Sequence, residues 1–181
     1  VIVSNYELIE KSKSGVFSQE SGAGILPVLR RAAFSNWQPQ EENTNSEGNR
    51  IILRIRRLRC KVCRSIHHEL PDILVPYKRH CSESIESVLD PEGTICVAAD
   101  DSTIRRWREW FRRYVDHFTG CLESITARLG GKTAKKVTRS SMSGFQRAID
   151  LVGNAPGWLA RIVRPVTNTN NWIHTRFAFL S

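Results

Sequence analysis

Several kinds of segment are missing from this 181-residue chain, and each absence excludes a class of protein. No apolar run approaches the roughly 18 residues that a membrane-spanning helix needs, so we expect no membrane partner. The first residues lack the basic region and long apolar stretch of a signal peptide, which favours the cytoplasm. The five cysteines are odd in number and unevenly spaced, which argues against a disulfide framework.

Acidic residues are scarce beside basic ones. The chain holds 27 Lys or Arg against 18 Asp or Glu, and its formal net charge is +9. Such a balance favours a polyanionic partner, of which nucleic acid is the commonest. The acids do not follow predicted strands in the way that a two-metal nuclease requires. A Gly-rich phosphate loop and a nucleophile elbow are also missing from the sequence. We therefore expect no catalytic residues, and a binding protein rather than an enzyme.

Residues 50–60 alternate between apolar and basic side chains, which predicts a β-strand. The apolar face comprises Ile51, Leu53 and Ile55, and the opposite face carries Arg54 and Arg56. The polar residues 38–49 before it predict a loop or a wide hairpin tip. We expect a small antiparallel β module here, with Arg54 and Arg56 contacting DNA.

The same strand leads into a Cys-x2-Cys pair, Cys60 and Cys63. Two thiolates at this spacing can chelate one Zn²⁺, but a structural site needs four ligands. The alternative is a reduced pair in a small apolar core. Further ligands would have to come from the nearby imidazoles and thiol, namely His67, His68, His80 and Cys81.

Helices are predicted downstream by apolar residues at helical spacing. Residues 82–89 form a short helix with Ser82 as its cap candidate. A longer helix runs over 103–129, with Asp101 or Ser102 as its N-cap. Gly120 leaves open whether this is one helix or two. Further short helices are expected at 145–152 and from about 156, the latter ending before Pro165.

The long helix separates its apolar residues from its basic residues. Trp107 and Phe111 lie at the centre of the apolar stripe and should be buried. Five arginines fall on the other side of the helical wheel: Arg105, Arg106, Arg108, Arg112 and Arg113. A core helix with a solvated basic face would show the same pattern.

A short helix, a connection and a basic helix together predict a helix-turn-helix-like element, although the connection over 90–101 is longer than usual. In that arrangement the first turn of the second helix reaches base edges and later residues reach phosphates. The predicted DNA contacts on this helix are Ser102, Thr103, Arg105, Arg106, Arg108 and Arg112.

These elements predict an α+β protein, with a small N-terminal antiparallel ribbon-like β module followed by a helical region. We divide it into a weakly ordered N-terminus (1–24), a degenerate zinc-ribbon-like module (25–80) and a helical region (81–181). The expected partner is double-stranded DNA. The alternatives are a protein-interaction or assembly factor that binds an acidic partner, and a decayed remnant that barely folds.

Several segments resemble a bacterial domain family, found mainly in Firmicutes, whose function is not established. They are Arg-Leu-Arg-Cys-Lys-Val-Cys (57–63), Ile-His (66–67), Leu-Pro-Asp-Ile-Leu-Val-Pro-Tyr-Lys-Arg (70–79), Asp-Ser-Thr-Ile-Arg-Arg-Trp (101–107), and the stretches 157–166 and 172–181. The family is similar to the zinc-ribbon and helix-turn-helix front half of insertion-sequence transposases, without a nuclease domain. The resemblance implies DNA binding by analogy.

The chain departs from this family at the upstream zinc knuckle. The family has Cys-Pro-x-Cys there, whereas this chain has Leu26-Pro27-Val28-Leu29. Two thiolates are thus replaced by leucines, which could close an apolar core in place of the metal. We therefore expect the zinc site at Cys60 and Cys63 to be incomplete and the protein to need no cofactor.

Overall fold

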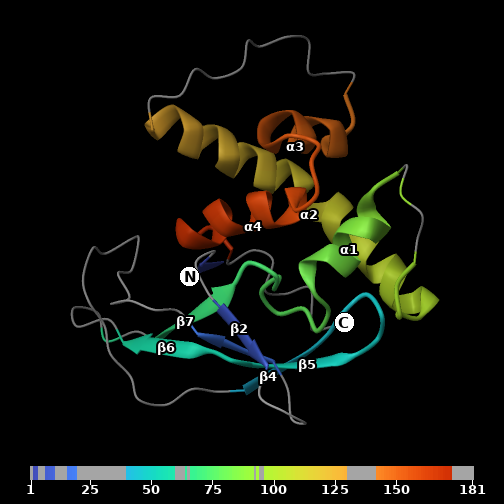
Figure 1. Cartoon of the computed structure of the whole chain (residues 1–181). Coiled ribbons are helices and arrows are strands. Elements are labelled where there is room, and N and C mark those ends of the chain that lie inside the picture. The colour runs from blue at the N-terminus through green and yellow to red at the C-terminus, as the bar shows by residue number, and fades with distance from the viewer. Residues whose placement is uncertain are drawn as a thin grey trace.

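The computed structural model describes residues 2–3, 7–10, 16–19, 40–59, 64, 66–91, 93, 96–129 and 142–172. Within these ranges β-strands come first along the chain and α-helices follow, so the predicted α+β class is confirmed. Figure 1 shows the helices gathered on one side of the molecule and the strands on the other. In this part of the chain no helix has the length and apolar character needed to cross a bilayer.

The strands form one three-stranded sheet and two hairpins. Their bounds are β1 Ile2–Val3, β2 Glu7–Glu10, β3 Val16–Gln19, β4 Gln40–Thr44, β5 Arg50–Arg54, β6 Arg56–Arg59 and β7 Ile66–Pro71. The larger sheet has the order β1-β7-β6, in which β1 is parallel to β7 and β6 is antiparallel to it. The pairs β2–β3 and β4–β5 are antiparallel.

The predicted strand over 50–60 is two strands that meet at Ile55. β5 pairs with β4, and β6 pairs with β7, so the chain changes partner at this residue. Leu53 and Ile55 are fully buried and pack with Leu74 in a small second core. The predicted apolar face is thus confirmed. The strand is broken at Ile55 because the residues before it pair with β4 and the residues after it pair with β7.

The described part contains four helices: α1 Ser82–Leu89, α2 Asp101–Arg128, α3 Gly144–Val152 and α4 Trp158–Asn168. α2 is a single helix through the exposed Gly120, where an added Cβ would meet no atom within 4 Å. The expectation of one helix is therefore confirmed over that of two. Its buried residues recur every three or four positions, as an amphipathic helix requires.

The main core lies between α2 and the three shorter helices. Trp107 and Phe111 are 4% and 5% exposed, which confirms their predicted burial. Phe111 contacts the Trp158 ring of α4, and Phe118 stacks on Trp172 with ring centroids 5.3 Å apart. Each buried aromatic side chain contributes about 1.5–3 kcal/mol through removal of apolar surface from water.

The predicted bounds of the first helix are confirmed, but the predicted N-caps of α1 and α2 are both wrong. Asp100, not Asp101 or Ser102, is the N-cap of α2, because its backbone is extended and its carboxylate accepts from the Thr103 N–H. α1 begins at Ser82 with Cys81 as its N-cap, and the Ser82 hydroxyl donates to the Asp72 carbonyl instead.

The predicted stop before Pro165 is also wrong, because α4 continues to Asn168. Pro165 has no N–H to donate within the helix. The last turn is held by burial of Val166 and by Asn168, whose side-chain amide bonds both backbone groups of Ile2 at 2.7 and 2.9 Å. Tertiary contacts thus outweigh the missing hydrogen bond.

Candidate nucleic-acid interface

The N-terminus of α2 is closed by the Asp100 carboxylate. Asp100 accepts from the Ser102 hydroxyl at 2.5 Å, from the Thr103 N–H at 2.8 Å and from the Thr103 hydroxyl at 3.0 Å. These hydrogen bonds favour the ionised form and hold the pKa of Asp100 well below its usual range. The hydroxyl protons of Ser102 and Thr103, two of the predicted DNA contacts, are therefore both engaged within the cap.

The five arginines in the first half of α2 are all exposed, on the side of the helix away from the core. Arg105, Arg108 and Arg112 follow one another at spacings of three and four, so they form one row along the helix. Arg106 and Arg113 are two turns apart and form a second row. Within the described residues none of the five has an ion-pair partner, whereas Asp116 farther along α2 pairs with Arg147 of α3.

The first row lies beside the end of α1. The Arg108 Nε–H donates to the Val88 carbonyl at 3.4 Å, which positions that guanidinium next to the last turn of α1. Arg105 and Arg112 make no such contact with described residues. The 105–108–112 row is therefore a set of three exposed cations without an ion pair to described residues, with the carboxylates of Asp101 and Glu109 one turn away on the same helix.

The second row lies beside the loop that follows β7. Lys78 places its Nζ 4.6 Å from the centre of the Trp110 ring, and the His80 ring packs edge-on against Trp107 at 4.8 Å. Burial lowers the pKa of Lys78 to about 8. Burial likewise lowers the pKa of His80, and the nearby Asp100 opposes that shift. Residues 75–80 are thus attached to the face of α2 that adjoins Arg106 and Arg113.

The two predicted strand arginines stand at the point where β5 gives way to β6. Arg54 pairs with Gln40 at the end of β5, and Arg56 pairs with Glu69 at the start of β6. These positions rest on the backbone, since their side chains lie outside the described part of the structure. The elements that pack most closely on α2 are α1, α3 and α4.

The predicted metal ligands Cys60 and Cys63 lie outside the described residues. They fall in sequence between Arg59 and Ile66, the last paired residues of β6 and β7. Across the described ranges no three or more His, Cys, Asp or Glu residues gather closely enough to hold a metal ion. The donors that are described therefore do not fit a complete zinc site.

The four substitute ligands considered for zinc have separate environments. His80 is packed against Trp107, and Cys81 is buried at the start of α1, where burial raises the pKa of its thiol. His67 differs, because its Nε2 is buried and has no hydrogen-bond partner in the described part. Burial, and then the positive charge of the N-terminus, lower the pKa of His67. His68 is exposed on β7.

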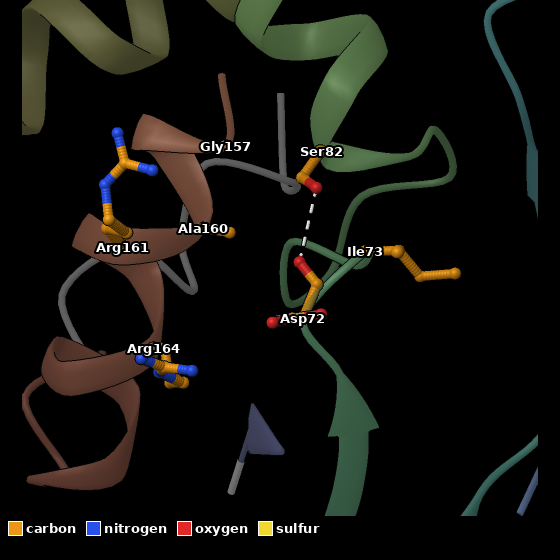
Figure 2. A pocket seen from close by; sticks show the side chains of 7 residues that line it. All are labelled: Asp72, Ile73, Ser82, Gly157, Ala160, Arg161 and Arg164. Atoms are coloured by element: carbon orange, nitrogen blue, oxygen red, sulfur yellow. Dashed lines mark hydrogen bonds between the residues drawn. The ribbon is translucent and has the colours of Figure 1, made fainter. Parts of the chain in front are cut away.

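A pocket of about 310 Å³ lies where α1, α4 and the turn after β7 meet, and Figure 2 shows its lining. Ser82 joins α1 to this turn by donating to the Asp72 carbonyl at 3.2 Å. The Arg161 guanidinium donates to the carbonyls of Val152, Gly153, Ala155 and Pro156, at 2.6–3.0 Å. Arg161 thereby closes the α3–α4 connection, and its donors are engaged in the fold.

Among known proteins, one family is similar to part of this chain. Residues 34–107 match the family described as Domain of unknown function (DUF6431). The match begins before β4, includes Cys60 and Cys63, and ends in α2 at Trp107, just past Arg105 and Arg106. No curated protein and no solved structure matches the chain. Residues 34–107 are therefore similar to the DUF6431 domain, whose description gives no function.

Proposed function

We propose that the protein binds double-stranded DNA through the basic face of α2, without catalysing a reaction on it. It would act as a DNA-binding protein related to the transposase-like proteins of mobile elements. The net charge of +9 supports an anionic partner. The family match supplies no activity, so the proposal depends on the arrangement of the arginines.

The observation that carries the proposal is the row of three exposed arginines on α2. Arg105, Arg108 and Arg112 are exposed on a helix whose other face is fixed in the core by Trp107 and Phe111. A row on a rigid helix loses little further freedom when it meets a partner, which favours tight contacts. It spans about 10 Å of helix axis, and one DNA strand presents a phosphate every ~3.4 Å along its axis.

The residues at the start of α2 affect which arginines would contact phosphates and which would contact bases. Asp100 and Asp101 are both exposed there, and two carboxylates repel a phosphate. We therefore assign phosphate contacts to the 105–108–112 row. Arg106 remains a candidate for reading bases, with Ser102 and Thr103 as hydroxyl acceptors beside it. Arg54 and Arg56 would extend the basic surface from the strands.

The main alternative is a protein partner with an acidic surface. The same arginines would serve it, so their exposure does not separate the two functions. The salt dependence does, because DNA binding releases condensed counterions and log K falls linearly with log salt, by about 0.9 per phosphate contact.

Binding of the full chain to a fluorescent random-sequence duplex, measured by anisotropy over a salt series, tests the proposal. We expect Arg105→Gln with Arg112→Gln to weaken binding to all duplexes and to lower the salt slope by about two. The matched control is Arg64→Gln with Arg128→Gln, which removes equal charge from exposed positions outside the proposed interface.

Equal losses in the two double variants would mean that net charge alone drives association, and would overturn the assigned interface. Failure of the wild-type chain to bind any duplex at low salt would overturn the function itself and favour the acidic protein partner. Arg106→Ala tests base reading: a loss of about 1–3 kcal/mol confined to particular sequences is expected if Arg106 contacts a base.

A further inference from the structure

The loop after β7 contains a turn with an unusual residue at its third position. The Lys78 N–H donates to the Val75 carbonyl at 3.0 Å, which closes a four-residue turn with Pro76 in second place. Tyr77, in third place, has a φ of 65°. Proline second and a positive φ third define a type II turn, whose third residue is normally glycine.

Tyrosine in this left-handed conformation is strained, whereas glycine is not. Burial in the core does not compensate, because the Tyr77 side chain is 53% exposed, among the largest exposures of a big apolar residue here. Strained backbone that the surroundings hold in place gathers at binding sites. Here Pro76 is buried on one side of Tyr77 and Lys78 is fixed over Trp110 on the other.

The neighbours of Tyr77 are cationic. Lys78 lies over the buried Trp110, and along α2 Trp110 is followed by Arg113 at a spacing of three and preceded by Arg106 at four. Arg79, next in the loop, is exposed. The Tyr77 loop is therefore anchored beside the 106–113 row, and the exposed Tyr77 ring has Lys78, Arg79 and this row as its cationic neighbourhood. Glu109 is the one acid between Arg106 and Arg113 along this side of α2.

We propose that Tyr77 stacks on an unpaired base where a single strand leaves the duplex. This rests on the proposed DNA binding and names its substrate class, a duplex that carries a single-stranded extension. Aromatic side chains beside cations are the usual platform for single strands, because every base has a face to stack and every nucleotide a phosphate to hold. In a fully paired duplex the base faces are stacked on one another, so the Tyr77 ring would have no base face to stack on.

The test compares three anisotropy probes on the full chain: a blunt duplex, the same duplex with a short adenosine tail on either strand, and the tail alone. We expect the tail to tighten binding over the blunt duplex by roughly 5- to 150-fold, the range for one stacked base. The readout is the ratio of the two affinities, which cancels effects common to both probes.

Three variants test whether the Tyr77 ring is responsible for that ratio of affinities. Tyr77→Asn removes the ring but tolerates a positive φ, so the turn is retained, and it should reduce the ratio to near one. Tyr77→Phe keeps the ring and should keep the ratio. Leu129→Asn, which changes another exposed apolar side chain, is the control and should also keep it. Melting curves establish that each variant is folded.

A wild-type ratio near one with intact duplex binding would overturn the stacking role and leave the proposed function standing. An equal loss in Tyr77→Phe and Tyr77→Asn would also overturn it, because the hydroxyl rather than the ring would then be responsible. Absence of binding to every probe would overturn both proposals together.

Discussion

The Glu86 side chain of α1 caps the N-terminus of α4 at Gly157, 71 residues farther along the chain. Its Oε1 accepts from the Gly157 N–H at 2.7 Å, and its Oε2 accepts from the Leu159 N–H at 2.9 Å. Gly157 has a φ of 82° and no side chain of its own to act as a cap. A carboxylate from another helix therefore satisfies these donors and complements the positive end of the α4 dipole.

Glu86→Ala should destabilise the fold. Two backbone donors would lose a charged acceptor, which costs about 1.5–3 kcal/mol. The shift in urea midpoint at constant slope measures this. Glu83→Ala, at an exposed position in the same helix, should stay within about 0.5 kcal/mol. Equal effects of the two changes would mean that α1 loses helix stability rather than α4 its cap.

Truncation of Trp107 tests the core of α2. Trp107 is 4% exposed and supports the His80 ring, so Trp107→Ala should cost roughly 3–5 kcal/mol, enough to unfold a marginal domain. Thermal melting measures the loss, with Trp107→Phe as an intermediate case. A melting temperature near that of the wild type would show that this turn of α2 is not part of the core.

The cap of α2 predicts a specific acid sensitivity. The pKa of Asp100 is lowered by the hydrogen bonds from Ser102 and Thr103. Its contribution to stability is therefore complete above the unfolded-state pKa, about 3.9, and is lost as pH falls through the lower folded-state pKa. Asp100→Asn keeps an acceptor but cannot titrate. The stability difference between wild type and this variant should shrink from pH 6 to pH 3, and a constant difference would contradict the assignment.

Zinc content tests the incomplete metal site. We expect the purified protein to carry less than one equivalent of zinc and to keep its fold in EDTA, since two of the four expected ligands are leucines and the described donors form no cluster. Elemental analysis and melting with and without chelator measure both. Stoichiometric zinc with unfolding on chelation would contradict the prediction, and loss of that zinc in His67→Ala would identify His67 as a substitute ligand.

Local patterns in the sequence predicted the helices well and their ends less well. The spacing of Ile85, Val88 and Leu89 gave the bounds of α1, and the stripe through Trp107 and Phe111 gave α2. Asp100, Asp101 and Ser102 all carry capping side chains, so their identity alone could not separate them. The extended backbone at Asp100 decides the matter.

The features that sequence reasoning missed depend on residues far apart in the chain. β1 lies parallel to β7, and Glu86 caps a helix that begins 71 residues later. Neither partner carries a local signal of the contact. Tyr77 lies in the segment 70–79 that carries the family resemblance, yet its conformation follows from a turn held against Trp110. Proline followed by an aromatic residue does not reveal a positive φ.

The pairing of Ile2 with Asn168 also affects the time course of folding during synthesis. The two residues are 166 positions apart, yet they are joined by two hydrogen bonds, and Ile2 is buried in the main core. At about 5–20 residues per second, a ribosome makes Ile2 roughly 10–30 s before Asn168. Throughout that interval the first strand lacks its helical partner, so the native core cannot close until α4 has been made.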